Sequence, residues 1–140
     1  MSGPGCELAS LGAPPGGVAG EVIAYAEAQL GKPYQWGATG PATFDCSGLT
    51  MMAYRAAGIF SAHQPAAMGL RHEHPRSQVR PGDLVFFAGA DGTLTAPGHV
   101  GIVIGHGLMI DAPAPGLTVR VESYLDSPGL AGFTQPVAAS

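Results

Sequence analysis

Cys46 is the residue of this chain best suited to covalent chemistry, because a helix is expected to begin there. Asp45 before it is a suitable N-cap, and apolar residues after it recur at helical spacing. The first amides of a helix have no partners within the helix, and its dipole places partial positive charge beside them. Both effects favour the thiolate, which is the nucleophilic form of cysteine. A small buried residue in an ordinary helix is the alternative interpretation.

Two strands are predicted further along the chain, over residues 99–104 and 108–112, with Gly105-His106-Gly107 as a three-residue loop between them. This loop gives a register in which apolar residues face one another and share one side of the hairpin: Ile104 with Leu108, Ile102 with Ile110, and Val100 with Ala112. We expect a two-residue loop to break this pairing and to move Asp111 to the wrong face.

His99 and Asp111 lie on the opposite face of this predicted hairpin. Asp111 is across from Gly101 and diagonal to His99, at about 7–8 Å between backbone positions. An imidazole and a carboxylate can span that distance, and Gly101 has no side chain to separate them. We therefore predict that His99 forms an ion pair with the Cys46 thiolate and later protonates a leaving amine. Asp111 would orient the imidazole, and water would hydrolyse a thioester.

The motifs around these residues, taken in order, resemble the NlpC/P60 family of cell-wall cysteine peptidases. They span about residues 20 to 125 and read GKPYQWG at 31–37, FDCSGL at 44–49, RPGDLVFF at 80–87, GHVGI at 98–102 and MIDA at 109–112. Each is weak alone, and the set is specific. The resemblance implies an α+β, papain-like fold with N-terminal helices packed on a central antiparallel sheet, which agrees with the order of the predicted elements.

The resemblance also implies an activity, namely hydrolysis of peptidoglycan stem peptides at the bond between D-glutamate and the diamino acid, or a close relative of it. Tyr34 would then contribute to the oxyanion site or a substrate clamp, and Asp45 and Ser47 would help to bind the polar substrate. The third catalytic residue of the family is most often His, so Asp111 is a departure, although a carboxylate also orients a histidine well. A thiol amidase or acyltransferase and a non-catalytic peptidoglycan-binding module are the competing functions.

Some of these residues also have purely structural interpretations. Asp45 alone is favoured as a helix cap. Trp36 is expected to be a core aromatic, and Tyr34 is open between core packing and the site. We predict no cofactor and no metal: the run His72-Glu73-His74, even with His63 or Asp83, matches no zinc spacing. Cys6 is interpreted as a free tail residue without a role.

Composition narrows the class of protein. Apolar residues make up 46% of the 140 residues and charged residues 11%, which suits one folded domain with a real core. The net charge is −4 and Lys32 is the sole lysine, so we expect no nucleic-acid partner. No apolar run approaches the roughly 20 residues of a membrane span. We expect a monomer that is secreted or held in the cell envelope, and a chain that is a processed form or excised domain, since a signal-peptide pattern is absent.

The elements are expected in the following arrangement. Residues 1–19 read as a flexible Gly/Pro-rich N-terminal arm or linker, and residues 20–140 as the catalytic domain. Helices are predicted over about 22–30, over 46–57 with Gly58 as the C-cap, and over 65–70. Further strands are predicted over 84–88 and 118–121, followed by a short helix over 122–125.

Overall fold

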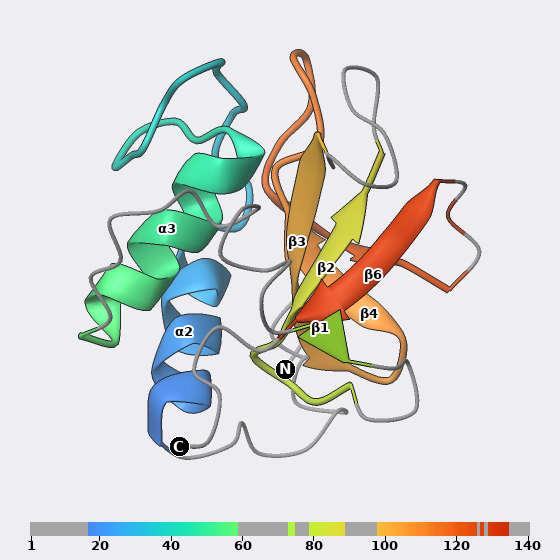
Figure 1. Cartoon of the computed structure of the whole chain (residues 1–140). Helices are drawn as coiled ribbons and strands as arrows, with labels where there is room; N and C mark the ends of the chain where they lie inside the picture. The colour runs from blue at the N-terminus through green and yellow to red at the C-terminus, as the bar shows by residue number, and fades with distance from the viewer. Residues whose placement is uncertain are drawn as a thin grey trace, which may run out of the picture.

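The computed structural model describes residues 17–58, 73–74, 79–88, 98–125, 127 and 129–134. In this part of the chain two helices lie beside a six-stranded antiparallel sheet, which is the α+β fold predicted from the sequence (Figure 1). The helices are α2 (Gly17–Ala28) and α3 (Cys46–Ala56). The strands are β1 (Glu73–His74), β2 (Leu84–Phe87), β3 (His99–Gly105), β4 (Leu108–Asp111), β5 (Arg120–Ser123) and β6 (Leu130–Thr134), in the spatial order β1-β6-β2-β3-β4-β5.

Helix α2 packs through three of the apolar residues that predicted it, whereas Leu30, at the end of the predicted range 22–30, lies beyond the helix. Val22, Ile23 and Ala26 are buried on one face. The helix ends at Ala28, shortly before Gly31, which has a positive φ of 91° that other residues adopt with difficulty. The helix begins at Gly17, so residues 17–19 of the expected arm are helical. The division of the chain into an arm and a catalytic domain otherwise stays a prediction, because residues 1–16 lie outside the described ranges, Cys6 among them.

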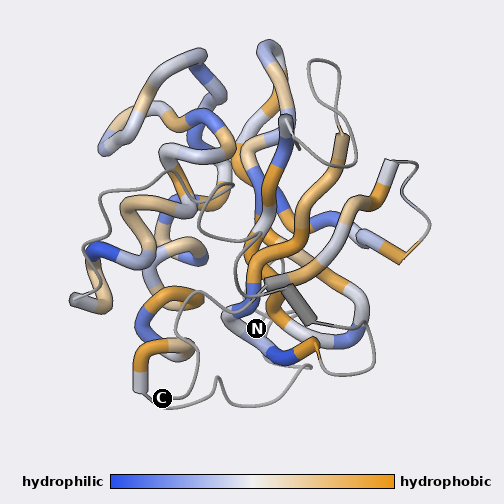
Figure 2. Tube along the Cα trace, in the orientation of Figure 1, coloured by the Kyte–Doolittle hydropathy of each residue, from blue (hydrophilic) through white to orange (hydrophobic). Residues whose placement is uncertain are grey.

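The sheet is covered on both faces at its centre, because β2 is buried at every residue. In Figure 2 the hydrophobic colour follows β2 through the middle of the sheet. One face of β2 and β3 packs with α2 and α3 in the main core, through Leu84, Phe86, Val100, Ile102 and Ile104. The other face packs in a second cluster with Val85, Phe87, Val103, Met109, Tyr124 and Phe133. Strand β3 therefore lies between the two cores and contacts both helices.

The β3–β4 hairpin has the predicted register at Ile102, which lies opposite Ile110, but not at the turn. The predicted pairing of Ile104 with Leu108 is wrong, because Gly105 pairs with Leu108 and the turn is the two residues His106 and Gly107. Both have positive φ, 56° and 77°, which two-residue hairpin turns of the mirror-image type require. A β-bulge between Val103 and Gly105 absorbs the odd residue. The claim that a two-residue loop would misplace Asp111 is therefore wrong, because the bulge restores the register.

The end of the chain differs more from the prediction. The strand expected over 118–121 runs from Arg120 to Ser123, and the helix expected over 122–125 is wrong because Glu122 and Ser123 pair with β4. The chain turns after β5, where the Ser127 hydroxyl donates to the Ser123 carbonyl at 3.3 Å. Strands β1 and β6 were not predicted. The helix expected over 65–70 lies outside the described residues, as do His63 and His72.

Candidate active site

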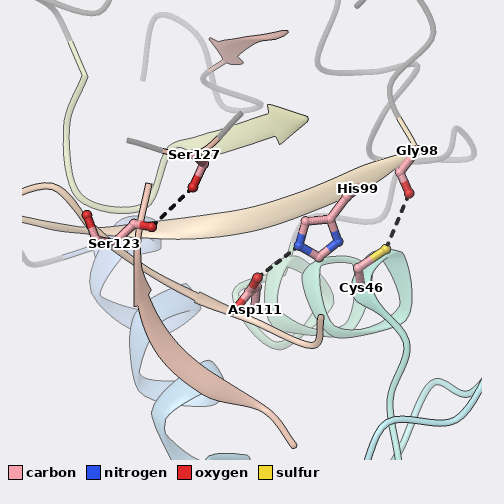
Figure 3. Close-up of polar contacts among 6 residues, drawn as sticks. All are labelled: Cys46, Gly98, His99, Asp111, Ser123 and Ser127. Atoms are coloured by element: carbon pink, nitrogen blue, oxygen red, sulfur yellow. Dashed lines mark hydrogen bonds and ion pairs between the residues drawn. The ribbon is translucent and has the colours of Figure 1, made fainter. Parts of the chain in front are cut away.

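Cys46 lies at the first position of α3, as predicted, and its side chain is partly exposed. Its thiol lies 3.9 Å from the carbonyl oxygen of Gly98, the residue that precedes β3 (Figure 3). This contact joins residues that are 52 positions apart in the sequence. The start of the helix and the start of β3 therefore meet at the sulfur, which remains within reach of solvent.

His99 and Asp111 are in contact, which confirms the meeting predicted from strand register. His99 Nε2 lies 2.8 Å from Asp111 Oδ2, with His99 17% exposed and Asp111 1% exposed. A side chain at Gly101 would come within 3.4 Å of the Asp111 Cβ and 2.6 Å of the Met109 sulfur. A glycine is therefore needed beside the pair, as expected.

The imidazole of His99 lies between the Asp111 carboxylate and the Cys46 sulfur (Figure 3). Because Nε2 is engaged by Asp111, Nδ1 is the nitrogen that faces the sulfur. The ring of Phe87 packs against the imidazole, with 5.6 Å between ring centroids, and limits its rotation. One nitrogen is thus held by a buried carboxylate while the other faces the thiol.

The electrostatics favour a protonated His99. Burial lowers the pKa of His99, but hydrogen bonds to Asp111 and Cys46, together with the negative charges of both, outweigh burial and raise this pKa to about 9. The imidazole is therefore charged at neutral pH. This arrangement can stabilise a thiolate–imidazolium pair, the reactive state of a cysteine nucleophile.

Asp45 is used by the protein as a helix cap and as a tie to the preceding loop. Its Oδ1 accepts from the Gly48 amide at 2.6 Å and from the Ser47 hydroxyl at 3.3 Å. Its Oδ2 accepts from the Gly37 amide at 2.9 Å. The predicted cap is confirmed, and the bond to Gly37 fixes the loop beside the first turn of α3.

Gly48 allows that loop to approach the helix. A Cβ at this position would lie 2.1 Å from the Ala38 carbonyl oxygen and 2.8 Å from Asp45 Oδ1. The Ala38 oxygen cannot move away easily, because it also accepts from the Asp45 amide at 3.0 Å.

We expect Gly48→Ala to lower the free energy of unfolding by about 1–3 kcal/mol, as overpacking does, although alanine is normally the better helix former. Thermal unfolding followed by circular dichroism would measure this change. An unchanged or higher melting temperature would mean that the loop at Ala38 moves aside freely.

Of the two aromatic residues considered in the loop before α3, Trp36 does not lie where it was predicted. Trp36 is 79% exposed, so its assignment to the core is wrong. It lies in a turn closed by the hydrogen bond from the Ala38 amide to the Gln35 carbonyl, which directs the side chain outward. Phe44 is the core aromatic instead, at 0% exposed. Tyr34 is half-buried and forms a bridge to Phe44, so it lies on the strand-like segment that leads into Cys46.

Glu122 was missed by the sequence reasoning. It lies on β5, diagonal to Asp111 on the adjacent strand, where burial and the Asp111 carboxylate raise its pKa. The alternation of side chains along a strand would have placed it beside Asp111, had the sequence indicated a strand there.

No group of three or more His, Cys, Asp or Glu residues suited to hold a metal ion occurs in the described ranges. Within the same ranges no helix is long and apolar enough to cross a bilayer. Asp83, which was considered as a metal ligand, instead accepts from the Arg80 amide at 2.9 Å in the turn before β2.

The sequence and the fold are similar to those of known proteins. The sequence model of the NlpC/P60 family matches residues 31–131. A probable endopeptidase p60 of Listeria grayi is 46% identical over 98 residues, which cover 68% of this chain and 18% of that protein. A probable endopeptidase of Mycobacterium bovis is 39% identical over 120 residues, covering 82% of this chain and 29% of the relative.

Among solved structures, the NlpC/p60 domain of the peptidoglycan hydrolase SagA superposes with a TM-score of 0.69 at 30% identity, covering 84% of this chain and 97% of that one. The chain spans about a fifth of the length of the Listeria relatives that it matches. The family match covers most of the chain, includes Cys46, His99 and Asp111, and agrees with the fold. The chain belongs to the NlpC/P60 family.

Proposed function

We propose that this protein is a cysteine endopeptidase that hydrolyses peptidoglycan stem peptides at the bond between D-glutamate and the diamino acid. The observation that carries the proposal is the alignment of Cys46, His99 and Asp111 at the start of α3 (Figure 3). Relatives named as probable endopeptidases and a similar domain from a peptidoglycan hydrolase support the substrate class. Because that substrate is the bacterial wall, we also propose that the protein acts in the cell envelope or after secretion.

In the first half of the reaction the Cys46 thiolate attacks the carbonyl carbon of the scissile amide. A carbon–sulfur bond forms, and the π electrons of the carbonyl move to its oxygen. The amide of Cys46, at the open end of α3, is available to stabilise that oxyanion. His99 then gives its proton to the amide nitrogen, the carbon–nitrogen bond breaks, and the amine leaves a thioester on Cys46.

In the second half water hydrolyses the thioester. Neutral His99 takes a proton from water as the water oxygen attacks the thioester carbon. The carbon–sulfur bond breaks, the carboxyl product leaves, and the thiolate–imidazolium pair is restored. Asp111 holds Nε2 throughout, which keeps Nδ1 directed at the sulfur and stabilises the charged ring.

Three further residues are proposed to act around this centre. Tyr34, on the segment that leads into α3, contributes to the oxyanion site or clamps the substrate. Asp45 and Ser47 shape the polar first turn that the stem peptide meets. Since both carboxylate oxygens of Asp45 are bonded within the protein, its effect on substrate is exerted mainly through the loop that it holds.

Digestion of purified peptidoglycan followed by mass analysis of the released fragments tests this function. We expect fragments cut between D-glutamate and the diamino acid. Release of the whole stem peptide from the glycan would indicate an amidase, transfer of an acyl group to an added amine would indicate an acyltransferase, and binding without any release would indicate a non-catalytic module. Each of these results would overturn the proposed endopeptidase.

A further inference from the structure

The second oxygen of Asp111 has no role in the proposed mechanism. Oδ2 contacts His99, whereas Oδ1 is buried and has no hydrogen-bond partner in the described part of the structure. A buried carboxylate oxygen without a donor is costly, and a carboxylate held at one oxygen is poorly fixed in orientation. A donor to Oδ1 would correct both deficiencies.

Strand pairing identifies the side chain that can supply this donor. Asp111 pairs with Arg120, and Met109 pairs with Glu122. Since side chains two residues apart share a face, Glu122 lies on the face of Asp111 and diagonal to it, within reach of a long side chain. Arg120 is directly across but makes no hydrogen bond to Oδ1. Glu122 is half-buried, so its carboxyl is partly withdrawn from water.

Two ionised carboxylates cannot bond to each other, so a contact between Glu122 and Asp111 needs a proton. Burial raises the pKa of Glu122, and the adjacent Asp111 carboxylate raises it further, against the opposing charges of Arg120 and His99. The resulting pKa is about 7. Glu122 is therefore mostly protonated in mildly acidic solution and about half protonated near pH 7.

We propose that Glu122 is a positioning residue, whose protonated carboxyl donates a hydrogen bond to Oδ1 of Asp111 and so holds Oδ2 against His99. The inference rests on the proposed function, because it matters for catalysis only if His99 and Asp111 act on Cys46. It extends the site by one strand, from β3 and β4 to β5.

The pH dependence follows from the charges that face Glu122, which are Asp111 on β4, His99 on β3 and Arg120 on β5 itself. As the pH rises through about 7, Glu122 ionises, the hydrogen bond is lost and two like charges oppose each other. Asp111 then loses its fixed orientation. The activity of the wild type should decline in this range, well before His99 loses its proton near pH 9.

Three variants test the role through kcat/KM on purified stem peptides, measured from about pH 5 to about pH 9. Glu122→Gln carries an amide that donates at every pH, so we expect activity within about twofold of the wild type at pH 6 and no decline near pH 7. Glu122→Leu cannot donate, and we expect roughly tenfold lower kcat with little change in KM. Glu27→Gln is the matched control, because burial also raises the pKa of Glu27 but it lies on α2, and its profile should match the wild type. Identical profiles for the wild type, E122Q and E122L would overturn the proposal.

An NMR titration of the Glu122 carboxyl carbon in the wild-type protein, assigned by its absence in E122Q, tests the hydrogen bond without turnover. We expect a midpoint near 7, whereas a midpoint near the ordinary value of 4.5 would overturn the proposal. If the wild type cuts peptidoglycan but Glu122 titrates near 4.5, only the Glu122 role fails. If Glu122 titrates near 7 but nothing is cut, the proposed function fails, and the positioning role fails with it.

Discussion

Cys46→Ala should abolish the release of stem-peptide fragments, with a loss of at least about 10⁴-fold in kcat/KM, because the variant has no thiol at the start of α3 to form the thioester. The fold should survive, since Cys46 is partly exposed and the change removes only a sulfur atom. We expect a change in unfolding free energy of about 1 kcal/mol or less. Mass analysis of peptidoglycan digests, with thermal unfolding of the same preparation, measures both quantities.

Cys6→Ala is the matched control for this variant, because it removes the other cysteine of the chain. Cys6 is predicted to have no role, so this variant should digest peptidoglycan at the wild-type rate. Binding of Cys46→Ala to intact peptidoglycan would show that the inactive variant still recognises its substrate. Undiminished hydrolysis by Cys46→Ala would eliminate the thiol mechanism and with it the proposed peptidase.

The register of the β3–β4 hairpin at Ile102 and Ile110 could be predicted because it depends on the alternation of apolar residues along two neighbouring segments. Apolar residues alternate along both segments, and one register buries them together, which places His99 near Asp111. The turn itself could not be predicted, because a two-residue turn with a bulge and a three-residue loop satisfy the same alternation. The positive φ of His106 decides between them, and most histidines do not adopt that conformation although histidine adopts it more often than most residues.

The loop before α3 shows where local reasoning stops. The cap at Asp45 follows from residue type and spacing, and the structure confirms it. The bond from Gly37 to the same carboxylate, and the close approach of Ala38 to Gly48, join segments that no sequence pattern links. Trp36 lies in the turn closed by the Ala38–Gln35 hydrogen bond and is exposed to solvent. Its aromatic residue type alone favoured a core position for Trp36, but the buried aromatic residue of this segment is Phe44.

The end of β5 and all of β6 were missed because their residues carry little of the usual strand signal. Strand β5 reads Arg-Val-Glu-Ser, which is polar enough to suggest a helix end or a loop. It is a strand because its backbone pairs with β4, an interaction between distant segments rather than a property of its own residues. Because the predicted strand stopped at Val121, Glu122 was missed, since only the pairing of β5 with β4 places that residue beside Asp111.

Asp111→Asn should lower kcat/KM by about 10²- to 10⁴-fold, because an amide can fix the wrong tautomer and cannot stabilise the imidazolium. The hydrogen bond and charge of Asp111 help to raise the pKa of His99 to about 9, so this pKa should fall in the variant. The mechanism needs a protonated His99 to form the ion pair. Activity is therefore lost as the pH rises through the pKa of His99, and in the variant this loss should occur at lower pH. The rate of Cys46 alkylation against pH reports the same ion pair without substrate.

The same variant should change how stability depends on pH. The pKa of His99 is higher in the folded protein than its ordinary value of 6.5, so its proton stabilises the fold. That contribution is complete below about pH 6.5 and is lost as the pH rises through about 9. In Asp111→Asn this decline should be smaller.

Asp83→Asn is the matched control, because Asp83 is also buried but lies before Leu84, at the opposite end of β2 from the Phe87–His99 pair. We expect Asp83→Asn to reduce stability without changing the pH at which kcat/KM falls on the alkaline side of its profile. If the alkaline loss of activity in Asp111→Asn stayed near pH 9, Asp111 would not control the charge of His99.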